Sequence, residues 1–529
     1  MKYILFLFTI SIFATHYNPK SSFNYKNYIK SNFKNFMESN KETTFGITNV
    51  RPDEGVDNIG NGFGDDEAFF YETEHFKFWY TKTGKHSVPL ADADENDVPD
   101  YIDLAAKVGE EVWEFYFTTL GYDTPISDGT AGGNSKMDFY FINLSGADGY
   151  IVTESCSPSY QCSGFMVIEN DFKFYNYPSQ EYALKVLISH EFFHIVQNSY
   201  FANGKGWVFW TEGTAVLNEE LYFPEQDDFE NFLPAFFDET EVALNYKKPS
   251  GSPDGRTYGS AIWAYWLTLQ YGDEIIREMW EKAREDSKTN DEFTIFTIFD
   301  DVLKTHGSSF KETFLEFSIA NIFTKDRTIN NFGYPKADNY PMLKFENDTD
   351  IKDIGYNYEY LSSMSANRYF KLNFYSDMDI VISISSKKDE INKEDRTISI
   401  IDPLTGEIIA RGEGELEFSI KGTTDYYLDI TDTRIEGRRL NLILDITEKP
   451  SCKNTKCHKF STCTMLNEIP TCMCDDGFVD YNGGCTPEVE HRTVDNGCNF
   501  SSSDSNSSLF FIIFFLLFIL KVKINRFQE

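Results

Sequence analysis

The residues best suited to chemistry are two histidines and a glutamate in the stretch LISHEFFHIVQNSYF, residues 187–201. His190 and His194 are four residues apart, so on a helix both imidazoles would lie on one face and could bind a single zinc ion. Glu191 would lie about 100° around that helix, where it could act as general base on a zinc-bound water. The alternative is an aromatic-rich core helix whose histidines bind no metal.

A hydrolytic zinc site needs a third protein ligand. Glu212 lies near the start of a second helical stretch, WTEGTAVLNEE, residues 210–220, and a carboxylate on a following helix can supply that ligand. We expect the small residues Gly213 and Ala215 to let this helix pack close to the first. A third histidine ligand is excluded, because HExxHxxGxxH requires Gly and His where this chain has Gln197 and Tyr200.

HEFFH followed by WTEGTA resembles the gluzincin metallopeptidases, in which HExxH and a downstream glutamate bind zinc. Residues 70–285 are similar, more narrowly, to a group of secreted bacterial metalloproteases. The similar segments, in order, are Phe76–Tyr80, Asp92–Tyr101, His190–His194, Trp210–Ala215 and Tyr258–Ala261. The resemblance implies an α+β zincin-like domain with His190, His194 and Glu212 as zinc ligands and Glu191 as general base.

The chain departs from the gluzincin pattern in two places. The aminopeptidase motif G-x-M-E-N is absent, which favours an endopeptidase. The acidic residue expected four positions after the third ligand is replaced by Val216, so the hydrogen bond to a zinc-bound histidine would have to come from Asn218, Glu219 or Glu220. Tyr258 could stabilise the oxyanion of the reaction, although simple packing is the alternative for this residue.

A second cation site is predicted in residues 92–103, DADENDVPDYID. The spacing resembles an EF-hand-like calcium loop, although Asp97 stands where the turn glycine belongs and Asp replaces the final Glu. The expected calcium ligands are Asp92, Asp94, Asn96, the carbonyl of Val98, Asp100 and Asp103. The alternative is a solvated acidic loop.

The composition predicts a large multidomain protein with real cores. The chain has 529 residues, of which 41% are hydrophobic and 16% aromatic. Its formal net charge is −36, which argues against nucleic-acid binding because there is no basic surplus to neutralise phosphates. The same acidity suits an extracellular surface and offers oxygen ligands for calcium.

Several domain boundaries can be proposed along the chain. The apolar start MKYILFLFTISIFA predicts a signal peptide over residues 1–18, with a buried helix as the alternative. Residues 19–64 are expected to be a leader, a propeptide or a mobile arm, and residues 65–340 the metallopeptidase-like domain. Short alternating apolar runs such as Ile380–Ile384 predict a β-sandwich over residues 341–449.

Six cysteines lie within Cys452–Cys485 at the spacing C-x4-C-x5-C-x8-C-x-C-x10-C, which by itself leaves the pairing open. The pattern resembles an EGF-like module over residues 452–486, with a zinc cluster as the alternative that secretion disfavours. The resemblance implies the disulfides Cys452–Cys463, Cys457–Cys472 and Cys474–Cys485. Cys156 and Cys162 are expected to form a local pair, which leaves Cys498 as an odd cysteine.

The C-terminal region predicts attachment to a membrane. A Ser-rich stalk, residues 487–508, precedes the apolar run LFFIIFFLLFIL and a basic tail within residues 509–529. The run rises about 18 Å as a helix, so both a short single-pass anchor and a lipid-anchor signal remain open. Secretion also gives meaning to the glycosylation sequons at Asn143, Asn347, Asn499 and Asn506.

Together these features predict a zinc endopeptidase on the extracellular face of the plasma membrane. Its cofactor would be Zn²⁺, with Ca²⁺ as a second, structural ion, and its partners a protein or peptide substrate and the membrane. The alternative is a catalytically inactive adhesion or receptor protein that keeps a peptidase-like domain for binding.

Overall fold

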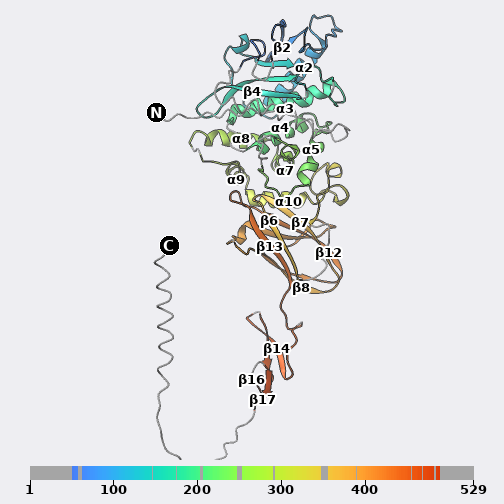
Figure 1. Ribbon diagram of the computed structural model, residues 1–529, viewed down its shortest axis with the longest axis vertical. Helices are drawn as coiled ribbons and strands as arrows, with labels where there is room; N and C mark the ends of the chain where they lie inside the picture. Colours follow the sequence, from blue (N-terminus) through green and yellow to red (C-terminus); the bar gives the residue numbers. More distant parts are fainter. Residues whose placement is uncertain are drawn as a thin grey trace, which may run out of the picture. The chain divides into compact units, whose positions relative to one another are not determined.

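The computed structural model describes residues 50–56, 62–145, 147–173, 175–202, 207–246, 253–289, 292–346, 355–388, 390–453, 455–467, 469–481 and 484–488. The chain divides into two compact units, Met1–Lys449 and Pro450–Glu529. Unit 1 contains an α+β region followed by a β-sandwich, and unit 2 contains a small disulfide-rich region (Figure 1). The expected multidomain α+β architecture is therefore present.

The α+β region is built on a five-stranded mixed sheet with strand order β1-β2-β3-β5-β4. The strands are β1 (Ala68–Glu72), β2 (Phe76–Thr81), β3 (Met137–Ile142), β4 (Gly149–Cys156) and β5 (Cys162–Glu169). Strands β2, β3 and β5 are parallel, whereas β1 and β4 are antiparallel edge strands.

The rest of the α+β region is mainly helical. A short π-helix, Glu114–Thr119, directly follows the helix Asp100–Trp113. The α-helices are α2 (Asp100–Trp113), α3 (Gln180–Phe201), α4 (Val208–Tyr222), α5 (Asp228–Phe237), α6 (Gly255–Gly259), α7 (Ala261–Tyr271), α8 (Glu274–Asp286), α9 (Ile295–Thr305) and α10 (Phe310–Ala320). Helix α3 lies between the sheet on one side and α4 on the other (Figure 1).

Helix α3 carries the two candidate zinc histidines. It begins after the N-cap Ser179, whose hydroxyl accepts a hydrogen bond from the Tyr182 amide at 3.1 Å. From Ala183 to Phe201 almost every side chain is buried, because the sheet covers one side of the helix and other helices cover the other. A helix buried all round needs no amphipathic pattern, so any polar side chain in it must have a specific partner.

The β-sandwich consists of two four-stranded antiparallel sheets, with orders β10-β9-β12-β7 and β11-β8-β13-β6. The strands are β6 (Tyr356–Ser362), β7 (Ala366–Phe374), β8 (Met378–Ser385), β9 (Arg396–Ile401), β10 (Ile408–Glu413), β11 (Glu415–Ile420), β12 (Thr424–Asp432) and β13 (Leu440–Glu448). Alternating apolar residues of both sheets form one buried core. This region belongs to the same compact unit as the α+β region.

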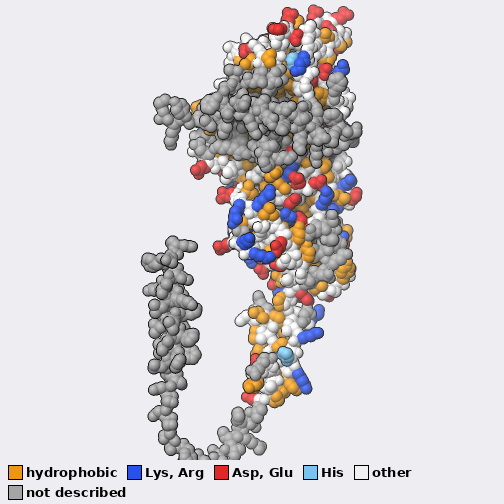
Figure 2. Space-filling view, in the orientation of Figure 1, with side chains coloured by type: hydrophobic (Ala, Val, Ile, Leu, Met, Phe, Trp, Pro, Cys, Tyr) orange, Lys and Arg blue, Asp and Glu red, His pale blue; other side chains and the backbone are white. Residues whose placement is uncertain are grey.

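Charged side chains are spread over the surface of unit 1. In the view of Figure 2, acidic side chains gather at the end of the α+β region near β2 and alternate with lysines and arginines over the sandwich. This face of unit 1 shows no broad basic patch, in keeping with the net charge of −36.

The stretch expected to be a leader contributes to the fold in its described part. Arg51 is only 2% exposed, and its guanidinium pairs with Asp128 at 2.5 Å, with Glu154 at 2.7 Å and with Asp138. Such a buried charge is tolerated only because it is paired. Residues 50–56 are therefore anchored against β3 and β4.

Unit 2 has two hairpins, β14 (Ser461–Leu466) with β15 (Ile469–Cys474) and β16 (Phe478–Tyr481) with β17 (Gly484–Pro487). Its three disulfides are Cys452–Cys463, Cys457–Cys472 and Cys474–Cys485, and the fourth, Cys156–Cys162, lies in unit 1. All four predicted pairs are confirmed. In so small a region disulfides take the place of a large core.

Several predictions fall outside the described residues. These are the signal peptide, most of the leader and stalk, Cys498, the apolar segment 509–529, and the sequons Asn347, Asn499 and Asn506. Among the described residues, no helix is both long and apolar enough to cross a bilayer. Asn143 is described and half-buried, and its side-chain oxygen accepts hydrogen bonds from Ser145.

Candidate metal centre

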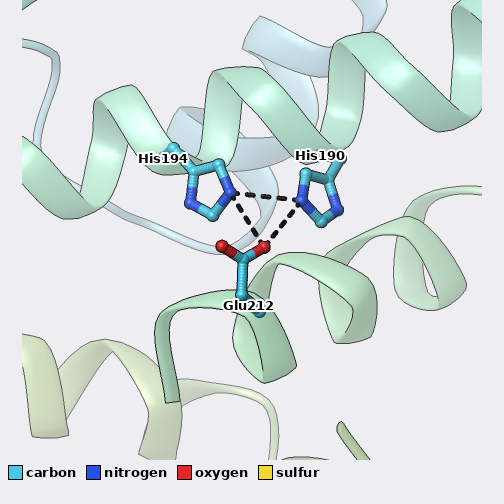
Figure 3. Close-up of side chains that lie close together, drawn as sticks. All are labelled: His190, His194 and Glu212. Atoms are coloured by element: carbon cyan, nitrogen blue, oxygen red, sulfur yellow. Dashed lines mark hydrogen bonds and ion pairs between the residues drawn. The ribbon is translucent and has the colours of Figure 1, made fainter. Parts of the chain in front are cut away.

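Helices α3 and α4 bring the three predicted zinc ligands together (Figure 3). His190 and His194 point from one face of α3 toward Glu212, which rises from α4. The two Nε2 atoms are 3.1 Å apart, and they lie 3.3 Å and 3.4 Å from Oε2 of Glu212. All three side chains are buried.

The spacing of these donor atoms fits a tetrahedral zinc site. Bonds of about 2.0–2.2 Å to a tetrahedral ion hold its ligand atoms about 3.3–3.5 Å apart, which is close to the observed distances. Two imidazoles and one carboxylate are also a ligand set that zinc accepts, with one position left for water. We conclude that the residues present would hold a zinc ion without rearrangement of the helices.

The other ring nitrogen of each histidine has its own acceptor. Nδ1 of His190 is hydrogen-bonded to Oε1 of Glu219, and Nδ1 of His194 lies 2.9 Å from Oε1 of Gln197. The Gln197 amide nitrogen in turn donates to the Thr211 carbonyl at 2.8 Å, which fixes which end of the amide faces the histidine. With a metal bound, both imidazoles would therefore keep their proton on Nδ1 and present Nε2 to the ion.

Among the three residues that could have replaced the missing acidic residue, the structure selects Glu219. The carboxylate of Glu220 pairs instead with Lys336 at 2.6 Å, and the amide of Asn218 donates to the Thr214 carbonyl at 2.8 Å. Gln197 was not predicted as a partner, although its position three residues after His194 places it on the same helix face.

The electrostatics of the cluster reflect close contact between acids and imidazoles. Burial alone would raise the pKa of Glu212, but the neighbouring histidines outweigh it and lower this pKa to about 2. Burial would likewise lower the pKa of His190, but the carboxylates of Glu219 and Glu212 raise it well above the ordinary value. A dense negative environment of this kind also favours a divalent cation.

Glu191, the predicted general base, is buried beside the cluster, directly after His190 in α3. The start of edge strand β4 closes over it. A Cβ atom added at Gly149 would lie 3.3 Å from Cγ of Glu191 and 3.1 Å from the Val167 carbonyl oxygen. The glycine thus allows β4 to approach α3 closely.

Tyr258, the predicted oxyanion stabiliser, lies in α6 and is buried. Its ring centroid is 6.2 Å from that of His190 and 4.9 Å from that of Phe232, on which it stacks. The structure therefore brings Tyr258 next to His190 of the candidate ligand cluster and also gives it a packing role.

One expectation about helix packing is wrong. Gly213 does not face α3, because a Cβ atom there would meet Ser260 Oγ at 3.0 Å and the Ala261 amide nitrogen at 3.2 Å. The small residue instead lets α4 pack against the junction of α6 and α7. This contact places α4, which carries Glu212, directly against the segment that contains Tyr258.

The acidic loop before α2 forms a second group of potential ligands. Carboxylate oxygens of Asp92, Asp94 and Asp100 lie within 4.8 Å of one another. The amide nitrogen of Asn96 donates to Asp94 and Asp103, and the carboxylate of Asp92 accepts from the backbone amides of Asn96 and Asp97. The half-buried Val98 donates its amide to Asn96 Oδ1 at 2.7 Å.

Two features of this loop bear on calcium. Asp97 has a φ of +68°, so it takes up the left-handed conformation that glycine supplies in an EF-hand loop. Burial, together with the carboxylates of Asp94, Asp100 and Asp92, raises the pKa of Asp103. One residue of the loop thus has the backbone conformation of the EF-hand turn position, and the carboxylates of the loop repel one another.

No protein-family model matches the chain, and no curated protein does. Among solved structures, PliG of Aeromonas hydrophila, a periplasmic inhibitor of g-type lysozyme, matches 19% of this chain and 96% of its own at 12% identity and a TM-score of 0.16. The pre-peptidase C-terminal domain of a Bacillus anthracis collagenase matches 19% of this chain and 95% of its own, at 12% identity and a TM-score of 0.15.

A third structure, aminopeptidase A of Legionella pneumophila in complex with aspartic acid, matches 68% of this chain at 12% identity and a TM-score of 0.32. The match covers 36% of that protein, so this chain spans about a third of its length. These values are too low to place the chain in a family.

Proposed function

We propose that this protein is a zinc-dependent endopeptidase of the gluzincin type. The observation that carries the proposal is the cluster of His190, His194 and Glu212, whose donor atoms lie 3.1–3.4 Å apart. Each histidine also donates a hydrogen bond from Nδ1, His190 to the Glu219 carboxylate and His194 to the Gln197 side-chain oxygen. Any buried histidine needs a partner for Nδ1, but the convergence of both Nε2 atoms on one carboxylate is what favours a metal site over a plain core helix.

When bound, zinc supplies a Lewis acid that polarises the scissile carbonyl and lowers the pKa of water toward about 7. The carboxylate of Glu191 would accept the proton of the attacking water and pass it to the leaving amine. Burial of Glu191 under Gly149 would keep bulk water away from this carboxylate. The hydroxyl of Tyr258 would donate a hydrogen bond to the developing oxyanion.

We also propose a cellular location for the enzyme and roles for its accessory regions. Four disulfides support an oxidising, extracytoplasmic location. We further propose that unit 2 is an EGF-like spacer before a membrane attachment, and that the loop of Asp92–Asp103 binds a structural Ca²⁺.

The test combines metal analysis with cleavage by the wild type, Glu191→Gln and the control Glu181→Gln. Glu181 is an exposed residue in the first turn of the same helix and pairs with Lys185 at 3.1 Å. We expect about one zinc per chain in all three proteins, and a loss of activity of about 10²-fold or more in Glu191→Gln alone. Casein and peptide libraries blocked by N-acetylation and C-terminal amidation are the substrates, because neither an aminopeptidase nor a carboxypeptidase can cleave peptides with both ends blocked.

Two results would count against the proposal. A chain that takes up no zinc would remove the metal centre. Zinc-loaded wild type that cleaves no peptide would instead favour the adhesion or receptor protein, whose peptidase-like domain only binds.

A further inference from the structure

A small cavity lies where the sandwich meets the segment that follows α5. It measures about 10 Å³, and its lining includes Arg396, Tyr360, Ser363 and Glu241. The segment is joined to the sandwich by two backbone hydrogen bonds of 2.9 Å, from Leu244 to the Ser365 carbonyl and from Asn367 to the Thr240 carbonyl. The cavity is thus located at a junction within unit 1.

The guanidinium of Arg396 has an edge without a hydrogen-bond partner in the described part of the chain. Its side chain is 2% exposed, and only Nη1 forms a hydrogen bond, to the Asn392 carbonyl at 2.8 Å. Nε and Nη2, which together form the edge that binds anions in a bidentate manner, have none. Arginine cannot relieve this by losing its proton, because it stays charged in proteins.

The nearby carboxylates do not satisfy this edge. Oδ2 of Asp432 is 3.7 Å from Nη2, too far for a hydrogen bond. Asp432 is already held by Arg434, at 2.7 Å from Nη2, and by the Ser362 hydroxyl at 2.6 Å. The other ion pair of Arg396, with Asp395, is 3.6 Å long and uses Nη1 rather than the open edge.

A third donor lines the same cavity. The hydroxyl of Tyr360, a residue that is 7% exposed, also has no hydrogen-bond partner among the described residues. A water molecule has two lone pairs, whereas a monatomic anion can accept hydrogen bonds from three donors. A cavity of this size suits about one small ion or water molecule.

We propose that this cavity binds a single chloride ion, held by Nε and Nη2 of Arg396 and the hydroxyl of Tyr360. The ion stabilises the junction between the sandwich and the segment around Glu241. This site is independent of the metal centre and of the proposed peptidase activity.

The test measures the Tm of the full chain in sodium gluconate and in increasing sodium chloride at constant ionic strength. We expect chloride to raise the Tm of the wild type by about 2 °C or more, because a ligand that binds only the folded state stabilises it. Arg396→Gln should abolish the rise. Tyr360→Phe should keep the fold and shift the chloride midpoint several-fold higher.

Arg411→Gln is the matched control, because Arg411 is an exposed arginine of the same sandwich that does not line the cavity; it should keep the full response. A crystal grown in bromide should show an anomalous peak within contact distance of Nε and Nη2 of Arg396. Equal Tm values of the wild type in chloride and gluconate, a response that survives Arg396→Gln, or a water without anomalous signal at the site would each overturn the proposal.

Discussion

Single residues around His190 show how the candidate metal ligands depend on neighbouring side chains that would not touch the metal themselves. Glu219 is fully buried and hydrogen-bonded to Nδ1 of His190, while the adjacent Glu220 is equally buried but pairs with Lys336. Burial raises the pKa of both carboxylates, which is about 7 for Glu220. Of these two glutamates, only Glu219 contacts a candidate metal ligand, which is His190.

We expect Glu219→Gln to weaken zinc binding about tenfold or more. The amide can still accept the hydrogen bond from Nδ1, but it lacks the negative charge that makes the imidazole a better ligand. Competition with a chromophoric zinc chelator measures the Kd directly. Glu220→Gln is the control with the same substitution one residue later, and an equal loss in both variants would assign the effect to general damage of α4.

At the scale of elements, the loop between β2 and α2 determines how α2 begins. Pro99 is the N-cap of α2 without a side-chain hydrogen bond, and Asp100 and Asp103 lie in the first turn. Acidic side chains are favourable at a helix N-terminus, yet here they also crowd Asp92 and Asp94. A bound cation would relieve this repulsion and hold the loop to the helix.

We expect calcium to raise the Tm of zinc-saturated protein, because a ligand at 100 times its Kd adds about 2.7 kcal/mol of stability. A thermal melt at fixed zinc with increasing calcium measures the effect without removing the other metal. Asp94→Asn should abolish the response. Glu95→Gln, in the same loop but outside the carboxylate cluster, should retain it; a response unchanged in Asp94→Asn would show that calcium acts elsewhere.

At the scale of the whole molecule, unit 1 is held together by buried polar contacts between α10 and the sandwich. The Ser318 hydroxyl donates to Oδ2 of Asp429 at 2.7 Å, and the Tyr369 hydroxyl donates to the Ser318 carbonyl at 2.9 Å. Asp429 is completely buried in β12, and burial raises its pKa to about 6. We therefore expect the α+β region and the sandwich to unfold together.

The raised pKa of Asp429 predicts how stability depends on pH. The folded state binds the proton more tightly than the unfolded state, whose carboxyl has a pKa near 3.8, so this group lowers stability as the pH rises from about 4 to about 6. Asp429→Asn should therefore gain roughly 2–3 kcal/mol relative to the wild type between pH 4 and pH 7. Urea denaturation at several pH values measures the difference.

Asp425→Asn is the control for this experiment, because Asp425 lies on the same strand, is half exposed and pairs with Lys371 at 3.8 Å. Its stability relative to the wild type should change little with pH. Parallel pH profiles for Asp429→Asn and the wild type would contradict the prediction.

The sequence by itself determined features that depend on neighbours along the chain. The spacing of His190 and His194 places both rings on one face of α3, Ser179 caps the helix, and the cysteine spacing is compatible with the three disulfides that the EGF-like pattern implied. Alternating apolar residues likewise indicated most strands of the sandwich. Helical and strand periodicities are local, so sequence alone reveals them.

Only the tertiary structure decided which distant side chains meet. It selected Glu219 over its two neighbours for His190, turned Gly213 toward Ser260 instead of α3, and buried Arg51 among three acids. It also left one edge of Arg396 facing a cavity. These contacts depend on how whole elements pack, and a helix can turn any of its faces toward a neighbour until the complete core fixes its rotation.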